Sequence, residues 1–232
     1  MQQFSDLRDA YIARVVSGKT FGEVGGLWGT VSEKVSVAHA HGATSLTMID
    51  VSPMDNELWL RFRARLVELR VPEVREISAD ICSITNEEIS GPFDVVHCSG
   101  VLYHHPNPMV MLLALRNITR QYLVLTSAVT QTVIENEHGR YEIPPSGVMF
   151  VPALSVQEFE IVRAYWQAIH VSGQGLTERC RYTIDNFDPW WWLPTPTSMM
   201  AMCEAAGFKV EDDGPNWEGN SHTVLLSVRQ RS

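Results

Sequence analysis

Three glycines and two carboxylates near the start of the chain have the types and spacing of a nucleotide pocket. Gly25, Gly26 and Gly29 follow a short apolar segment that carries Glu23 near its end. Glycine lets the backbone approach a ligand closely because it has no Cβ, and the helix after such a turn offers its N-terminus to the ligand. Asp50 ends the next apolar segment, where a carboxylate accepts hydrogen bonds from ribose hydroxyls. The pattern predicts a site for a cofactor that contains a nucleoside.

A second group of reactive side chains, Tyr103, His104 and His105, follows the apolar stretch 92–100. Histidine titrates near neutral pH, so it is suited to general-base catalysis. We take His104 as the first candidate for a catalytic base and His105 as the second. The alternative is that these side chains only shape the loop through hydrogen bonds to the backbone, because group transfer depends on positioning more than on a base.

Composition limits the class of protein and its partners. The chain has 232 residues, 45% of them hydrophobic and 19% charged, which suits one domain over 1–232 with a single large core. The formal net charge is -9 and no run of Lys or Arg occurs, so affinity for nucleic acid is disfavoured. We expect a small-molecule substrate instead.

The cysteines and the apolar runs indicate the compartment. Cys82, Cys98, Cys180 and Cys203 form no C-x-x-C pair, so we expect reduced thiols and neither a disulfide framework nor a metal site. The first residues are charged throughout, unlike a signal peptide, and no apolar run reaches the roughly 18 residues that span a bilayer. The expected location is the cytoplasm, with no membrane contact.

The hydrophobic periodicity predicts alternating strands and helices. Strands are expected at 19–24, 45–50, 73–80, 92–100, 121–129, 208–212 and 221–228. Helices are expected at 4–16, at 30–41, from a cap at Ser52 up to Pro72, at 108–119 and at 198–207. This order predicts an α/β fold with a doubly wound, Rossmann-like sheet. The sheet should be mostly parallel, with an antiparallel C-terminal hairpin strand.

The segment 130–194 interrupts the alternation. Its one clear element is a helix capped by Ser155, with Glu158 three residues later, and the rest is rich in proline and aromatic residues. We expect an inserted lid that covers the substrate side of the sheet. Because successive indoles cannot all face one core, at least one of Trp190, Trp191 and Trp192 should line a cavity or an interface. Together with Tyr103, they are the candidates for substrate binding.

Two motifs resemble those of the class I S-adenosylmethionine-dependent methyltransferases. Residues 23–29, EVGGLWG, are similar to the first motif, an acid followed by G-x-G-x-G, although Leu27 stands where the middle glycine is usual. Residues 93–108, FDVVHCSGVLYHHPNP, resemble the fourth-strand motif, most closely that of the branch that alkylates the wobble uridine of tRNA. The string WWLPT at 191–195 is similar to another motif of that branch.

The resemblance implies S-adenosylmethionine as the cofactor and assigns a role to each matching position. The glycines of 25–29 would pass under the methionine moiety, and Asp50 would bind the ribose. Asp80 and Ile81 would flank the adenine. Ser99 and Gly100 would line the sulfonium end.

The favoured function is therefore methyl transfer to the oxygen or nitrogen of a small molecule. A dinucleotide-dependent dehydrogenase is disfavoured, because no frame of 22–29 gives G-x-G-x-x-G. Two alternatives remain open. One is a tRNA uridine alkyltransferase, which the fourth-strand motif suggests. The other is a catalytically degenerate nucleoside-binding or scaffold protein, which Leu27 suggests.

Overall fold

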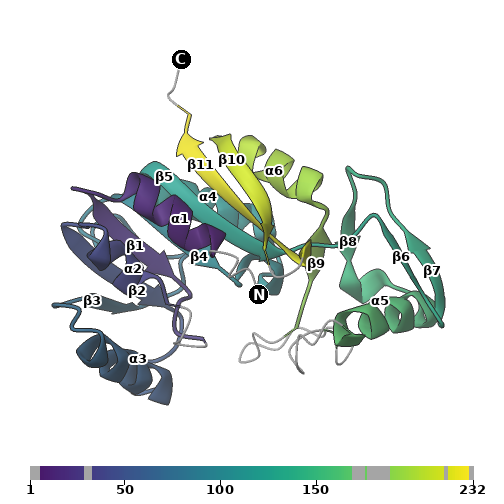
Figure 1. Cartoon of the computed structure of the whole chain (residues 1–232), viewed down its shortest axis with the longest axis horizontal. Coiled ribbons are helices and arrows are strands. Elements are labelled where there is room, and N and C mark those ends of the chain that lie inside the picture. The colour runs from purple at the N-terminus through teal and green to yellow at the C-terminus, as the bar shows by residue number, and fades with distance from the viewer. Residues whose placement is uncertain (1–5, 29–32, 169–175, 177–188, 217–218, 230–232) are drawn as a thin grey trace.

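The computed structural model describes residues 6–28, 33–168, 176, 189–216 and 219–229 (Figure 1). The strands of its main sheet are β1 (Thr20–Val24), β2 (Ser45–Asp50), β3 (Arg75–Ser78), β4 (Phe93–Ser99), β5 (Thr119–Ala128), β10 (Phe208–Asn216) and β11 (Ser221–Val228). The helices around this sheet are α1 (Leu7–Val15), α2 (Val35–Ala40), α3 (Glu57–Glu68), α4 (Pro108–Ile118) and α6 (Pro196–Ala205), with a short 3-10 turn, η2 (Leu102–His104), after β4.

The seven strands lie in the order β10-β11-β5-β4-β1-β2-β3. Neighbours from β5 to β3 are parallel, and β11 is antiparallel to both β5 and β10. The predicted sheet, with its antiparallel C-terminal hairpin, is therefore confirmed. The chain leaves β1 in one direction to form β2 and β3, and it returns past β1 to form β4 and β5. The strand order reverses between β1 and β4, and open α/β sheets bind ligands at the carboxyl end of such a switch point.

Helices cover both faces of the sheet because alternate residues of each buried strand point to opposite sides. On one face, Val95 packs in a core with residues of α1, α2 and α3. On the other face, Val96 packs in a core with residues of α4 and α6. Figure 1 shows α1 lying across the sheet near α2. Helices α1 and α2 pack side by side, so Asp6 at the start of α1 lies close to Lys34 at the start of α2.

Two helix starts differ from the sequence prediction. Helix α2 begins at Val35, and Glu33 and Lys34 precede it in a non-helical conformation, whereas the sequence predicted a helix from residue 30. Helix α3 begins at Glu57, because the side chain of Asn56, rather than Ser52, accepts the capping hydrogen bond from the backbone N–H of Leu58. In both cases the connection after the strand is longer than the periodicity predicted.

The segment 130–194 contains more structure than its sequence indicated. The predicted helix is present as α5 (Val156–Ala168), and its capping box joins Ser155 and Glu158 through two hydrogen bonds. The additional elements are β6 (Val133–Asn136), β7 (Gly139–Glu142), β8 (Val148–Phe150), the 3-10 turn η3 (Val151–Ala153) and β9 (Trp192–Pro194). They form two antiparallel pairs, β6 with β7 and β8 with β9.

This segment has a hydrophobic core of its own, which also includes Tyr103 and Ala128 from the ends of the main sheet. Figure 1 shows α5, β6, β7 and β8 to one side of the sheet, and along the chain β5 leads into β6 while β9 leads into α6. The four strands were missed because each is only three or four residues long. No helix in the described part of the chain is both long and apolar enough to cross a membrane.

Candidate active site

The candidate site lies at the carboxyl ends of β1 and β4, where the strand order reverses. A glycine with positive φ directly follows each strand, Gly25 at 74° and Gly100 at 77°, a conformation that other residues rarely adopt. The N–H of Gly25 donates to the carbonyl of Ile49 in β2 at 2.9 Å, and the N–H of Gly100 donates to the carbonyl of Thr126 in β5 at 3.1 Å. These bonds fix both turns to neighbouring strands.

Glu23 is buried beneath the glycine turn, where it caps α2. Its carboxylate accepts hydrogen bonds from the backbone N–H of Lys34 at 2.9 Å and of Val35 at 2.9 Å. A Cβ on Gly26 would lie 2.6 Å from Cδ of Glu23, so the chain can pass over the carboxylate only because residue 26 is glycine. Glu23 thus acts from inside the protein and holds the turn and the helix together.

The imidazole of His97 is the side-chain neighbour of Glu23. His97 is buried in the middle of β4. Its Nδ1 lies 3.3 Å from Oε1 of Glu23, and its Nε2 is buried without a hydrogen-bond partner. The parallel register of β1 and β4 places these two residues side by side. The pairing of a carboxylate with a mid-strand histidine could not be read from one sequence.

Leu27, at the position of the missing motif glycine, is fully buried in the core with α1, α2 and α3. The next side chain, Trp28, is 65% exposed. Gly29, the last glycine of the motif, lies outside the described residues. The first turn is therefore formed by Gly25 and Gly26, and Leu27 anchors the loop to the core.

The two predicted acidic positions differ in burial. Asp50 is buried at the end of β2, and its Oδ1 accepts a hydrogen bond from the N–H of Ser52 at 2.9 Å. Strand β3 ends at Ser78, two residues earlier than predicted, so Asp80 lies in the following turn and is exposed. The side chain of Asp80 accepts from the N–H of Cys82, while Ile81 is buried in the core.

A network of two buried cations and two partly exposed carboxylates borders the site on the side of α1, and the sequence analysis missed it. Arg8 is 6% exposed, forms an ion pair with Asp6, and donates from a guanidinium nitrogen to Oγ of Ser99 at 3.2 Å. Lys34 is 5% exposed and lies 2.7 Å from Asp6 and 2.5 Å from Asp9. The charges of these two cations and two carboxylates balance. The network connects the start of α1 to Ser99 and to the start of α2.

Tyr103 and His104 are in η2, directly past Gly100. The centroids of their rings are 4.3 Å apart, and the ring centroid of Tyr103 is 4.8 Å from that of the Trp190 indole. Nδ1 of His104 lies 3.2 Å from the carbonyl oxygen of Pro189. Burial raises the pKa of Tyr103 far above its ordinary value, so its phenol stays protonated. A Cβ on Gly100 would meet, among the described atoms, only the hydroxyl of Tyr103 at 3.7 Å.

His105 has different surroundings. Its Nε2 lies 3.4 Å from Sγ of Cys82, and its Nδ1 lies 2.7 Å from the carbonyl oxygen and 3.0 Å from the backbone nitrogen of Asn107. Burial, with a smaller contribution from Asp80, raises the pKa of Cys82 to about 11, so the thiol is protonated near neutral pH. His105 therefore lies against the connection after β3, while His104 lies against Trp190.

The three tryptophans have different environments, as the argument from successive indoles anticipated. Trp190 is 3% exposed and is packed between Tyr103 and Trp166 of α5. Trp191 and Trp192 are partly exposed. The indole of Trp192 donates from Nε1 to the carbonyl of Pro106 at 2.9 Å. Trp190 thus belongs to the core of the 130–194 segment, and its two neighbours lie at the surface.

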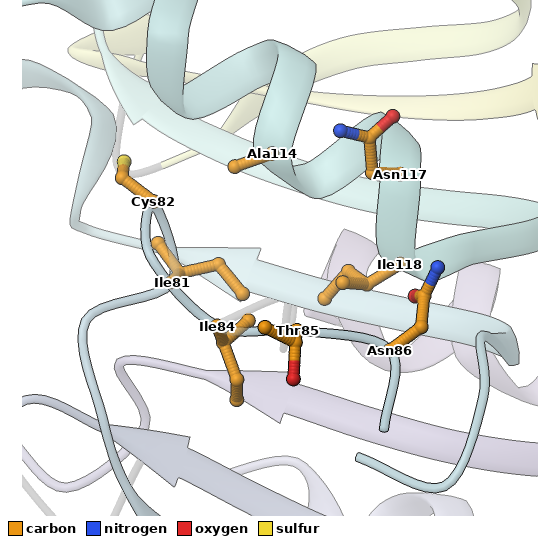
Figure 2. Close-up of a pocket in the computed structure, with 8 residues that line it drawn as sticks. All are labelled: Ile81, Cys82, Ile84, Thr85, Asn86, Ala114, Asn117 and Ile118. Atoms are coloured by element: carbon orange, nitrogen blue, oxygen red, sulfur yellow. The ribbon is translucent and has the colours of Figure 1, made fainter. Parts of the chain in front are cut away.

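One cavity, of about 300 Å³, lies on the face of the sheet covered by α4. Figure 2 shows the connection after β3 on one wall and α4 on the other. Its lining residues are Ile81, Cys82, Ile84, Thr85, Asn86, Ala114, Asn117 and Ile118. The cavity extends from Ile81 toward the end of α4 farthest from η2, and His104 does not line it. We therefore do not assign the substrate to it.

Comparison with known proteins identifies the fold. No family model matches the chain, and no curated protein matches its sequence. A magnesium protoporphyrin IX methyltransferase from Synechocystis with bound S-adenosylhomocysteine has 14% identity and a TM-score of 0.59, over 97% of this chain and 82% of that one. A glycopeptide N-methyltransferase complexed with sinefungin has 13% identity and a TM-score of 0.59, over 98% and 96%.

A third structure is a 1,6-didemethyltoxoflavin-N1-methyltransferase from Burkholderia thailandensis, with that substrate and S-adenosylhomocysteine bound. It has 10% identity and a TM-score of 0.55, over 97% of this chain and 80% of that one. The chain therefore has the fold of S-adenosylmethionine-dependent methyltransferases. At these identities the likeness concerns the fold, and function must be argued from the site.

Proposed function

We propose that this protein is an S-adenosylmethionine-dependent methyltransferase that acts on a small molecule. The observation that carries the proposal is the placement of Glu23 and Gly25 at the carboxyl end of β1, with Asp50 at the end of the adjoining β2, in a chain with the methyltransferase fold. Ligands of open α/β sheets bind at this edge. The structural neighbours support the same cofactor, since several contain S-adenosylhomocysteine or an analogue.

The chain offers groups suited to each part of the cofactor. The carboxylate of Asp50, at the tip of β2, is suited to the ribose hydroxyls. Asp80 and the apolar Ile81 would flank the adenine. Gly25 and Gly26, with Gly29, would pass under the methionine moiety. The sulfonium end would lie at Ser99 and Gly100, where the positive φ and the open space before Gly100 leave room near the Tyr103 hydroxyl.

The bound cofactor supplies a methyl group that is already activated on a sulfonium. The task left to the protein is to hold an acceptor in line with that methyl and to accept a proton when the acceptor is a hydroxyl or a protonated amine. We assign Nε2 of His104 as the atom that accepts the substrate proton. The carbonyl of Pro189 cannot donate a hydrogen bond, so its contact with Nδ1 requires that the neutral ring already carry its own proton on Nδ1. His105, which contacts Cys82, is the second choice.

The segment 130–194 would act as an inserted lid over the acceptor, within one domain of residues 1–232. Its core is continuous with Tyr103 in η2, so the lid and the proposed transfer site share packing. The exposed parts of Trp191 and Trp192, with the Tyr103 hydroxyl, would contact a partly apolar or planar acceptor. Trp190 would contribute through its packing on Tyr103.

Binding of S-adenosylhomocysteine tests this proposal directly. At about 100 times its dissociation constant, the nucleoside should stabilise the folded protein by roughly 2.7 kcal/mol, whereas NAD should give no stabilisation. Asp50→Asn retains an oxygen for the N–H of Ser52 and loses the charge, so affinity should fall at least about tenfold. Asp55→Asn, an exposed carboxylate in the same connection, is the matched control and should bind normally. Unfolding that is unchanged by the nucleoside would refute the proposal.

The fourth-strand motif at 93–108 favours one second candidate, a tRNA uridine alkyltransferase. It would use the same cofactor site, and the two candidates differ in the acceptor. A catalytically degenerate nucleoside-binding or scaffold protein is the third reading. Its motivation was Leu27, whose side chain packs in the core and leaves the turn at Gly25 intact. Nucleoside binding without methyl transfer to any acceptor would favour this third reading.

A further inference from the structure

We propose that the segment that returns from the lid, residues 189–192, sets the tautomer and the orientation of His104, with Trp190 as the positioning residue. The inference rests on the proposed function only where His104 is said to accept a proton from the substrate. The tautomer itself is a property of the protein alone.

The tautomer follows from the chemistry of one contact. The carbonyl oxygen of Pro189 can only accept a hydrogen bond, so Nδ1 of His104, 3.2 Å away, must be the donor. In the neutral ring the single proton is therefore on Nδ1, and the lone pair is on Nε2. A neutral histidine that makes no such bond carries its proton mainly on Nε2. The tautomer of a histidine is set by the hydrogen bond that its other nitrogen makes, and here the lid supplies that bond.

The Pro189 carbonyl is held in place by a series of contacts along the 103–106 loop. The N–H of Trp191 donates to the carbonyl of Tyr103 at 2.8 Å. Nε1 of Trp192 donates to the carbonyl of Pro106 at 2.9 Å. The two segments thus run side by side, and each residue from 189 to 192 contacts this loop. A shift of residues 189–192 would move the Pro189 carbonyl away from the imidazole of His104.

Trp190 connects this arrangement to the core of the lid. Its indole packs edge-on against Tyr103 at 4.8 Å and against His104 at 6.3 Å. Its other neighbour is Trp166 of α5, with the ring centroids 4.7 Å apart and the ring planes at 86° to each other. Because Trp166 and Trp190 are both almost fully buried, neither can rotate without disturbing the other. The position of α5 therefore determines the position of His104.

This arrangement gives the lid a role beyond covering the site. A lid that docks correctly would bring the Pro189 carbonyl to Nδ1 and leave Nε2 able to take a proton. A displaced lid would release the ring to the opposite tautomer. The lid would thus prepare the base at the same time as it covers the acceptor, which limits proton transfer to the closed arrangement.

Nitrogen-15 NMR of the full chain with labelled histidine tests the inference. The His104 signals are identified by their loss in His104→Gln, and the spectrum is recorded at a pH where the His104 ring is neutral by its own titration. In the wild type, Nδ1 should show the shift of a protonated nitrogen and Nε2 that of an unprotonated one. A proton on Nε2 in the wild type would overturn the proposal without any variant.

Matched variants test the role of Trp190. Trp190→Leu should move His104 toward the Nε2–H tautomer, while Trp190→Phe, which keeps an aromatic ring, should restore the wild-type signals. Trp59→Leu is the control, because it removes a buried indole of the same size from the core beside α3. If Trp190→Leu folds and leaves the tautomer unchanged, the positioning role is refuted. If Trp190→Leu fails to fold, Trp166→Leu, which removes the indole that packs on Trp190, takes its place, and an unchanged tautomer in that variant refutes the positioning role.

Activity separates this inference from the proposed function. With a proton-bearing acceptor, Trp190→Leu should lower kcat about 100-fold, the size expected for losing general-base help, with unchanged affinity for S-adenosylhomocysteine. A protein that binds no nucleoside but shows the Nδ1–H tautomer would refute the function and keep the structural inference. A shifted tautomer with normal kcat would refute the link between the lid and the base.

Discussion

At the scale of single residues, the site depends on the backbone conformation of Gly25. Its φ of 74° turns the chain out of β1, and a Cβ there would overlap Cγ2 of Val101, just after β4. The two strand ends can approach each other only because this residue has no side chain. Glu23 then caps α2 from below, so the turn is held on both sides.

Gly25→Ala should therefore cost more than the conformational penalty alone. Gly18 is a matched control, since its φ is 71° and no atom lies within 4 Å of its would-be Cβ. Gly18→Ala should lower the free energy of unfolding by about 1–2 kcal/mol, the cost of a left-handed non-glycine residue. Gly25→Ala should add about 1–3 kcal/mol of overpacking and weaken binding of S-adenosylhomocysteine.

Urea unfolding and nucleoside titration of the two variants provide the measurement. Equal losses of stability, together with intact nucleoside binding in Gly25→Ala, would show that the close approach to Val101 is not required.

At the scale of elements, α1 is joined to the cofactor loop by charge. Asp6 receives hydrogen bonds from Arg8 and Lys34 at 2.7 Å each, and both cations are buried. Burial alone would raise the pKa of the Asp6 carboxyl, but the hydrogen bonds and charges of Arg8 and Lys34 outweigh it and hold the pKa well below the ordinary 3.8. The first helix is therefore fixed to the site by an ionised carboxylate.

The sign of the resulting pH dependence follows from linkage. A carboxyl whose pKa is lower in the folded state stabilises the fold above its unfolded pKa and loses that contribution as the pH falls toward the folded value. The free energy of unfolding should therefore decrease below about pH 4, and Asp6→Asn should make that decrease shallower. Urea unfolding at a series of pH values measures both slopes. Identical acid slopes for the wild type and Asp6→Asn would contradict this account of α1.

The connection between α5 and η2 is the other arrangement at this scale. The capping box of Ser155 and Glu158 starts α5, and the buried face of that helix places Trp166 against Trp190. The proposed base is thus positioned by an element more than fifty residues later in the chain than His104. Insertions of this kind can change acceptor specificity while the sheet and its glycine turn stay the same.

At the scale of the whole molecule, net charge distinguishes the two acceptor classes. A protein that binds tRNA neutralises phosphates with Lys and Arg, and its affinity falls steeply with salt. This chain has a formal net charge of -9, from 27 acidic and 18 basic residues. We expect no measurable affinity for tRNA at low ionic strength, and no steep salt dependence for the small-molecule acceptor.

Fluorescence anisotropy with labelled tRNA, from low to physiological salt, measures the first expectation. Saturable binding that weakens steeply as salt rises would favour the tRNA alkyltransferase. The binding of S-adenosylhomocysteine serves as the control that the protein is active and folded under each condition.

The sequence by itself determined the order of the main strands and helices along the chain, and it placed the glycine turn and Asp50 at the ends of strands. Long apolar runs such as 45–50 and 92–100 predict buried strands. A glycine or an acid at the end of such a run therefore lies at the end of a strand. The antiparallel final hairpin was equally predictable, since β10 and β11 are joined by a short turn-forming segment. Local pattern was sufficient for these features.

Only the tertiary structure decided which side chains meet. The pairing of Glu23 with His97 depends on strand register, the contact of Arg8 with Ser99 spans 91 positions, and His104 meets the Pro189 carbonyl across 85. Periodicity describes one element at a time and contains no information on the neighbour of that element. The starts of α2 and α3 were misplaced for a related reason, because the first is capped by a residue of the preceding strand and the second by Asn56, while Ser52 gave an equally good local signal.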